Sequence, residues 1–336
     1  MEKFTIKGLW QVFKQAASNF ISDKVTKLSA SLAYYTLFSL APMLIVVIYL
    51  SNLLYREEAI EGSLYNQMKG FVGDNAALQI QEIIKNASYS GSNTLHAIIG
   101  FATLLIGATT IFAEIQDSIN TIWRLRPKVN GGWQIMLKKR LLSFSMLVSL
   151  AFLLLVSLLI NGLVEGLMDK LQRYFPQATI LLVYVVNLAI TLLVTSSLFA
   201  IIFKVLPDAL IRWRDVFAGA MFTALLFMLG RIAISVYISN TNPASAYGTA
   251  GSLVILLLWI YYSSIILYFG AEFTKCYTLK FGHEIRPKSY AVIVQTVQVE
   301  SHNKSLQQDE KEAASLEKEL QKAKDDMEND NQPADK

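Results

Sequence analysis

One arginine lies deep inside an apolar stretch of this sequence. Residues 224–238 read ALLFMLGRIAISVYI, and no lysine, aspartate or glutamate stands within ten residues of Arg231. A guanidinium binds carboxylates and phosphates through a planar fork of donors. Arg231 is therefore a candidate contact for an anionic headgroup or solute. It could instead extend to the polar surface, bond to carbonyl oxygens of a neighbouring helix, or pair with Glu165 or Asp169.

A second group of small and polar residues recurs every three or four positions. The group is His96, Gly100, Thr103, Gly107, Thr110, Glu114, Asp117 and Thr121. On a helix these positions share one face. Glycines allow close helix packing in lipid, so Gly100 and Gly107 are predicted packing positions. Glu114 and Asp117 either end this packing face near the headgroups or line a polar path through the membrane.

Residues for bond-making chemistry are scarce. The chain has three histidines and one cysteine, Cys276. No two histidines have the spacing of a zinc helix, and no phosphate-binding glycine loop is present. A single cysteine also excludes an internal disulfide. We therefore predict no catalytic residue, no metal, no cofactor and no ATP hydrolysis, so the chain is not expected to be an enzyme.

Long uncharged runs must position these residues. Hydrophobic residues make up 53% of the chain and charged residues 17%, whereas soluble domains carry about 25% charged residues. The runs without Lys, Arg, Asp or Glu are 28–55, 86–113, 141–164, 174–203 and 232–271. Each is long enough for the roughly 20-residue helix that crosses a bilayer. We predict an all-α polytopic membrane protein with six transmembrane helices, near 28–54, 93–118, 141–164, 178–203, 216–238 and 248–274.

Basic residues alternate between the predicted connections. They gather before the first helix, in the second and fourth connections, and after the sixth helix. The members are Lys3, Lys7, Lys14, Lys24, Lys27, Arg124, Arg126, Lys128, Lys138, Lys139, Arg140, Lys204, Arg212, Arg214, Lys275, Lys280, Arg286 and Lys288. Positive residues stay cytoplasmic during insertion, which predicts that both termini are cytoplasmic. The same rule explains why the second connection is basic, so nucleic-acid binding is not needed to account for it. The alternative explanation is that this connection binds anionic lipid headgroups.

The polar residues inside the predicted helices lie at different depths in the membrane. Arg231 lies about 22 Å along the fifth helix from its cytoplasmic start, at 1.5 Å per residue. Glu272 and Glu114 lie near cytoplasmic helix ends, so depth argues against an Arg231–Glu272 pair. Asn187 and Glu272 would instead extend the polar path predicted at Glu114.

The chain divides into three predicted regions. Residues 1–27 form an amphipathic helix, either interfacial or packed on the cytoplasmic ends of the bundle. Residues 28–280 form the transmembrane domain, with an extracytoplasmic connection at 56–92. Residues 281–336 form a cytoplasmic, polar, partly disordered tail, for which a partner-binding coil is the alternative.

Three further residues are predicted to shape helices. Pro42 is expected to break and bend the first helix, as prolines do in many membrane proteins. Gly248 and Gly251 open the last helix, where small residues suit tight packing.

Four sequence blocks resemble the YihY/BrkB family of bacterial inner-membrane proteins. They are ASLAYYTLFSLAPMLI at 30–45, INTIWRLRP at 119–127, LPDALIRWRDVFAGAMFTALLF at 206–227 and YGTAGSLVILLLWIYYSSIILYFGAEFTK at 247–275. The resemblance runs from about residue 10 to 280, and it implies a six-helix, multi-pass protein of the bacterial cytoplasmic membrane. Some members carry the label ribonuclease BN, but this sequence contains no group of residues that could form a nuclease active site. The family has no established catalytic set, so no residue roles are carried over.

These observations predict an exporter or flippase-like transporter for an amphipathic or anionic envelope component. Its partners would be membrane lipids and an anionic lipid or amphipathic solute, not nucleic acid. The alternative is a non-transporting scaffold for envelope integrity that binds partners through 56–92 and the tail. A membrane-embedded enzyme ranks third and a ribonuclease last. The oligomeric state is left open.

Overall fold

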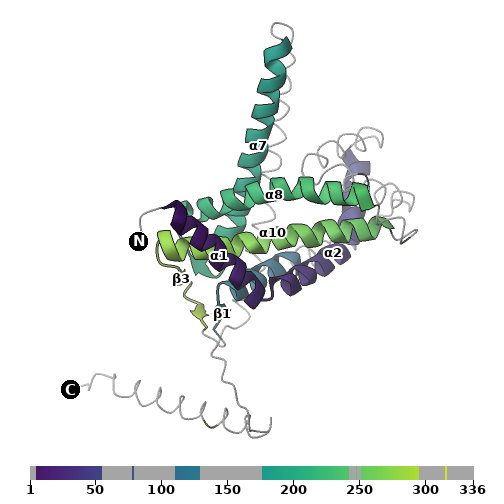
Figure 1. The fold of residues 1–336 in the computed structure, drawn as a ribbon. Coiled ribbons are helices and arrows are strands. Elements are labelled where there is room, and N and C mark those ends of the chain that lie inside the picture. The colour runs from purple at the N-terminus through teal and green to yellow at the C-terminus, as the bar shows by residue number, and fades with distance from the viewer. Residues whose placement is uncertain are drawn as a thin grey trace, which may run out of the picture. The chain divides into compact units, whose positions relative to one another are not determined.

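Helices make up most of the described chain. The computed structural model describes residues 5–54, 78, 110–128, 176–241, 247, 251–294 and 315. The helices are α1 (Ile6–Ser22), α2 (Val25–Leu54), the helical segment 110–122, α7 (Pro176–Val205), α8 (Trp213–Thr241) and α10 (Gly251–Phe281), drawn in Figure 1. The strands are β1 (Leu125–Pro127), β2 (Ala209–Leu210), β3 (Arg286–Pro287) and β4 (Ala291–Ile293). The prediction of a mostly helical chain is therefore confirmed.

Three described helices are long and apolar enough to cross a bilayer. They run over Val185–Val205, Trp213–Thr241 and Leu253–Phe281, and they correspond to the predicted fourth, fifth and sixth spans. The predicted third span, 141–164, lies outside the described residues. So do the packing positions Gly100, Gly107 and Gly248.

The ends of the helices differ from those predicted from the uncharged runs. α8 begins at Trp213 rather than near 216, and α10 continues to Phe281 rather than ending near 274. The helical backbone hydrogen bonds continue beyond the charged residues that flank each apolar run, whereas a prediction from hydropathy ends the helix at those residues. α2 also remains helical across Pro42, so the predicted break does not interrupt the helix. Gly251 is the first residue of α10 and is buried.

α8 and α10 are held together by a reciprocal glycine–threonine contact. A Cβ added at Gly219 would lie 2.0 Å from Oγ1 of Thr274, and one added at Gly270 would lie 2.1 Å from Oγ1 of Thr223. Each threonine hydroxyl donates to a carbonyl of its own helix, Thr223 to Gly219 and Thr274 to Gly270. The hydroxyls therefore need no partner across the interface, and the two backbones approach closely.

α1 packs along the carboxyl-terminal half of α10. Its buried residues are Gly8, Val12 and Ala16, at four-residue steps that form one ridge. Phe13 adds edge-to-face contacts with Phe222 of α8 and Phe269 of α10. One face of α1 therefore packs on α8 and α10.

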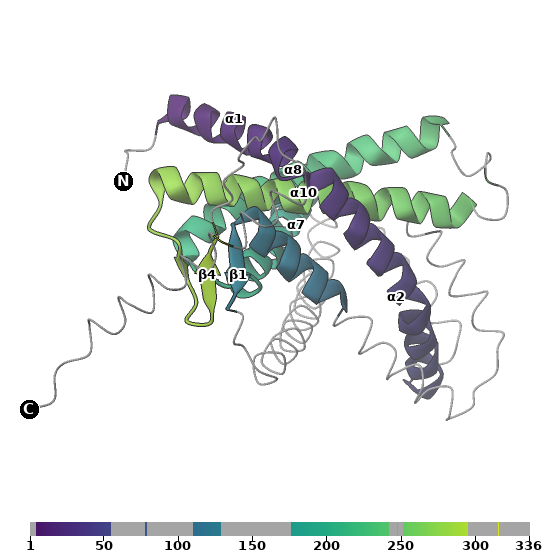
Figure 2. The same ribbon diagram turned by 90° about the horizontal axis from the view of Figure 1, so that it is seen from below.

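Two small antiparallel pairings connect segments that are distant in sequence. β1 pairs with β4, with Arg126 opposite Val292, and β2 pairs with β3. In Figure 2, β1 and β4 lie side by side next to the helical segment 110–122. We call residues 286–293 the clasp, because they join the second and fourth connections. The compact unit runs to Val294. Residues 281–294 therefore belong to this unit, although the sequence analysis assigned them to the tail.

Candidate functional site

The predicted polar residues do not form one site. Glu272 is fully buried on α10, and Glu114 is half-buried. Asp117 and Asn187 are exposed. Arg231 is half-buried on α8 and takes part in an interaction. Of the predicted set, Glu272 has the most enclosed surroundings, and these define the candidate site.

Glu272 belongs to a cluster built from both ends of the chain. Nδ2 of Asn19 donates to its Oε2 at 3.4 Å, and Nζ of Lys275 lies 3.4 Å from the same oxygen. Lys275 also lies 3.7 Å from Oδ2 of Asp23, in the turn after α1. The ammonium donates to the carbonyl oxygen of Ile122 at 2.5 Å. We call Asn19, Asp23, Glu272 and Lys275 the Glu272 cluster.

The Glu272 cluster is short of hydrogen bonds and of positive charge. Oε1 of Glu272 and Oδ2 of Asp23 are buried, and neither accepts a hydrogen bond in the described part of the chain. Burying an ion costs several kcal/mol unless partners compensate. Two carboxyl groups share one ammonium, and adjacent carboxylates disfavour each other's ionised form. The described residues therefore leave two buried carboxyl oxygens of the Glu272 cluster without a hydrogen-bond donor.

A polar stripe on α10 leads away from the Glu272 cluster. Tyr268 and Ser264 precede Glu272 at four-residue steps, so the three share one helix face, and all are buried. The hydroxyl of Tyr268 has no hydrogen-bond partner in the described part of the chain. The sequence analysis did not select Tyr268.

Asp208 is a second buried acid that sequence reasoning missed. Its carboxylate accepts from Gln116 at 2.9 Å, Asn120 at 3.0 Å and the hydroxyl of Tyr290 at 3.2 Å. Its backbone N–H donates to Oδ1 of Asn120, and its carbonyl accepts from the N–H of Lys288. These bonds satisfy the carboxylate and join the segment 110–122, the fourth connection and the clasp. Asp208 is therefore an anchoring residue.

Burial raises the pKa of Tyr290 to about 12, and the adjacent Asp208 charge adds to the rise. The neutral phenol is favoured because it donates to the carboxylate. The only sequence signal for Asp208 was its place in the block LPDALIRW, between two apolar runs.

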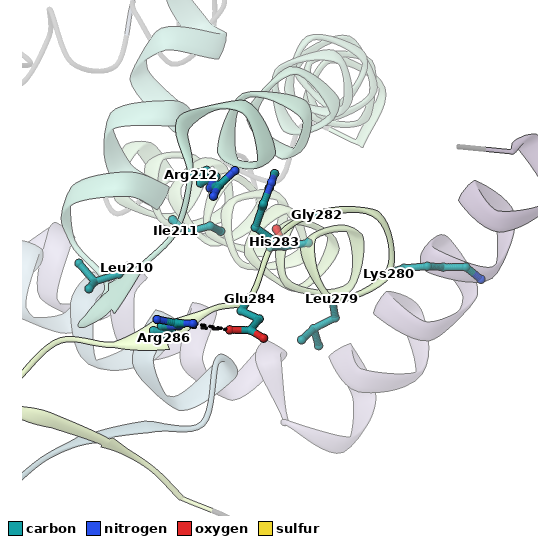
Figure 3. Close-up of a pocket in the computed structure, with 10 residues that line it drawn as sticks. Leu210, Ile211, Arg212, Leu279, Lys280, Gly282, His283, Glu284 and Arg286 are labelled. Atoms are coloured by element: carbon teal, nitrogen blue, oxygen red, sulfur yellow. Dashed lines mark hydrogen bonds and ion pairs between the residues drawn. The ribbon is translucent and has the colours of Figure 1, made fainter. Parts of the chain in front are cut away.

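Two hollows open at the same end of the bundle. The first, the clasp groove, has a volume of about 790 Å³ and lies between the fourth connection and the end of α10. In Figure 3, Glu284 faces Arg286, while Lys280 points away from both. Arg286 donates to Glu284 at 2.8 Å, which lowers the pKa of Glu284. His283 lies 3.3 Å from Asp215. The clasp groove therefore mixes both signs of charge.

The second hollow, the α1–α10 groove, carries cations without acids. It has a volume of about 960 Å³ and is bounded by α1, α10 and Arg124. Its charged lining residues are Lys14, Arg124, Lys275 and Lys280. Lys275 therefore belongs to both the groove and the Glu272 cluster, so an anion in the groove would act on the ammonium that compensates the buried carboxyl groups.

Metal chemistry has no support among the described residues. No three His, Cys, Asp or Glu side chains within residues 5–54, 110–128, 176–241 and 251–294 are grouped to hold a metal ion. Cys276 is buried beside Asn19, at 3.5 Å between Nδ2 and Sγ.

Known proteins with similar sequences are described as membrane proteins. A family model described as Virulence factor BrkB matches residues 16–291. A UPF0761 membrane protein of Aeromonas salmonicida is 26% identical over 266 residues, covering 77% of this chain and 86% of that protein. One of Tolumonas auensis is 28% identical over 264 residues, covering 75% and 80%. No solved structure matches the chain.

Proposed function

The chain belongs to the Virulence factor BrkB family of membrane proteins, and from this premise we propose that it exports or flips an anionic amphiphile across the bacterial inner membrane. No covalent chemistry is part of the proposal. The positive-inside rule supports placing the basic end, with both termini, in the cytoplasm.

The observation that carries the proposal is the buried, incompletely compensated Glu272 cluster. Ionisable groups inside membrane proteins are costly, and they commonly mark ion paths and proton relays. A purely structural group would be expected to have its oxygens satisfied, as those of Asp208 are. Oε1 of Glu272 has no such partner in the described part of the chain.

The cluster supplies a coupling device. When Glu272 holds a proton, the Lys275 ammonium balances the single negative charge of Asp23. Loss of that proton leaves a second buried negative charge, which favours a rearrangement that brings water or a cation to it. Because Lys275 also lines the α1–α10 groove, protonation is coupled to the charge that an anionic solute meets there.

The test measures lipid movement in liposomes that contain the purified protein. The probe is fluorescent short-chain phosphatidylglycerol, and chemical quenching of outer-leaflet probe follows its movement with and without a pH gradient. We expect movement by the wild type that depends on the gradient. Glu272→Gln should remove the dependence on the gradient, because an amide cannot release a proton.

The matched control is Glu284→Gln. Glu284 is an exposed acid near the same end of α10, paired with Arg286, and its replacement should leave movement unchanged. The proposal fails if correctly folded wild-type protein moves no anionic probe. It also fails if Glu272→Gln keeps the wild-type response to the gradient.

A further inference from the structure

The α1–α10 groove concentrates positive charge from three separate segments. Lys14 comes from α1, Arg124 from the turn after residue 122, and Lys275 and Lys280 from α10. In the part of the chain that the structure describes, the side chains of Lys14 and Arg124 make no ion pair or hydrogen bond. Two uncommitted cations facing one hollow create a field that favours an anion.

The backbone at Arg124 is held in a strained conformation. Its φ is 57°, a left-handed conformation that costs an L side chain energy and that glycine normally takes at a helix end. Its N–H donates to the carbonyl of Thr121, and its own carbonyl accepts from Val294. The turn is therefore fixed on both sides, and it holds a guanidinium where glycine would fit with less strain.

A second cation has the same backbone but lies outside the groove. Lys24, in the turn between α1 and α2, has φ 51°, is exposed, and does not line the hollow. A positive charge at a helix carboxyl end is favourable in itself, and this explanation applies equally to both residues. Lys24 therefore provides a matched control for Arg124.

The outer surface of α1 indicates where the ligand comes from. Ile6, Trp10 and Ile21 are 84%, 66% and 77% exposed. Apolar side chains on a basic amphipathic helix insert at the boundary between headgroups and acyl chains. This insertion would bring the α1–α10 groove to the level of the lipid phosphates.

We propose that the α1–α10 groove binds the phosphate of an anionic phospholipid headgroup, with Arg124 and Lys14 as its main contacts. Arg124 offers the forked donors that suit a phosphate, and Lys14 adds charge from α1. This is an equilibrium binding site, and it holds whether or not the chain transports a solute.

The test measures lipid binding to the full-length protein in an uncharged detergent by native mass spectrometry. The probes are phosphatidylglycerol, zwitterionic phosphatidylcholine and water-soluble glycerol 3-phosphate. We expect phosphatidylglycerol to bind more tightly than the other two, and to weaken as salt rises. Arg124→Gly should weaken it by about tenfold, as the loss of one charge-assisted contact predicts. Lys14→Gln should weaken it less.

The design separates binding from folding. Arg124→Gly removes a strained side chain, so the variant should unfold at the wild-type temperature or above it. Lys24→Gly removes the same charge and the same strain, and its affinity should remain that of the wild type. Equal losses in Arg124→Gly and Lys24→Gly would overturn the site. Equal binding of phosphatidylcholine or glycerol 3-phosphate would overturn the anionic lipid as its ligand.

Discussion

At the scale of single residues, Glu272 shows what surrounds an acid inside the bundle. Its neighbours Asn19 and Asp23 come from the opposite end of the sequence, and Lys275 follows one turn later on α10. The ammonium of Lys275 is the one cation in contact with both carboxyl groups among the described residues. It therefore determines how much of their burial cost is compensated.

We expect Lys275→Met to destabilise the folded protein by about 3 kcal/mol, because removing one partner of a buried ion pair leaves the other charge uncompensated. The free energy of unfolding in detergent, from denaturant titration, measures the change. The double variant Lys275→Met/Glu272→Gln should recover most of the loss, since it also removes a carboxylate. A double variant no more stable than Lys275→Met would mean that Lys275 acts through its bond to Ile122 alone.

At the scale of elements, α8 and α10 depend on two glycine–threonine contacts of the same form. Each motif reads Gly-x-x-x-Thr, at 219–223 and at 270–274, and the helices run in opposite directions, so each glycine meets the threonine of the other helix. Close packing replaces the hydrophobic effect as the force between helices in lipid. These two motifs therefore fix the separation of the helices that carry Glu272 and Arg231.

Gly270→Ala is expected to destabilise the protein by about 1–3 kcal/mol, the usual cost of overpacking. Thr223 would have to move, because its Oγ1 lies 2.1 Å from the added Cβ. Thr223→Ala in the same chain removes the clashing atoms, so Gly270→Ala/Thr223→Ala should regain much of the loss. Thermal unfolding in detergent compares the three variants. Leu225→Ala, at an exposed position on α8, is the control, and an equal loss there would contradict the interpretation.

The clasp should respond to alkaline pH through Tyr290. Its pKa is raised from 10.0 to about 12 in the folded protein, so the folded state retains a proton that the unfolded state loses. The stabilisation is complete below pH 10 and is lost as pH rises through about 12. Tyr290→Phe should cost about 1 kcal/mol near neutral pH, through the lost hydrogen bond to Asp208. Unfolding measured from pH 8 to 12 should show this difference shrink, and a constant difference would contradict the assignment.

Sequence patterns predicted the elements better than their contacts. Uncharged runs located α7, α8 and α10 because bilayer thickness fixes a minimum apolar length, and the resemblance to the YihY/BrkB family is confirmed. Asp208 and Asp23 could not be found in this way, because their partners lie far away in sequence. The face containing Glu114 and Asp117 is half-buried or exposed, whereas the neighbouring Gln116 and Asn120 are buried. Helical periodicity identifies a face, but only packing decides which face points inward.

At the scale of the whole molecule, the strand pairings bring segments with the same predicted orientation to one end. The clasp reaches both the second connection, through β1, and the fourth, through β2. α1 packs on the same end of α10, which carries Lys275 and Lys280. A structure in which these segments faced opposite sides of a membrane could not form the pairings. The common end is therefore the one that the positive-inside rule would place in the cytoplasm.

Single cysteines introduced into a Cys276→Ser chain test this orientation. Lys128 and Ser289 are exposed at the clasp end, whereas Thr241 ends α8 and Tyr247 follows it. A maleimide that cannot cross the inner membrane should label Thr241→Cys and Tyr247→Cys in spheroplasts. Lys128→Cys and Ser289→Cys should react only after the membrane is opened. Labelling of all four from outside would contradict the transmembrane path of α8, and the reverse pattern would place the basic end outside. Either result would remove the α1–α10 groove from the leaflet that its charge predicts.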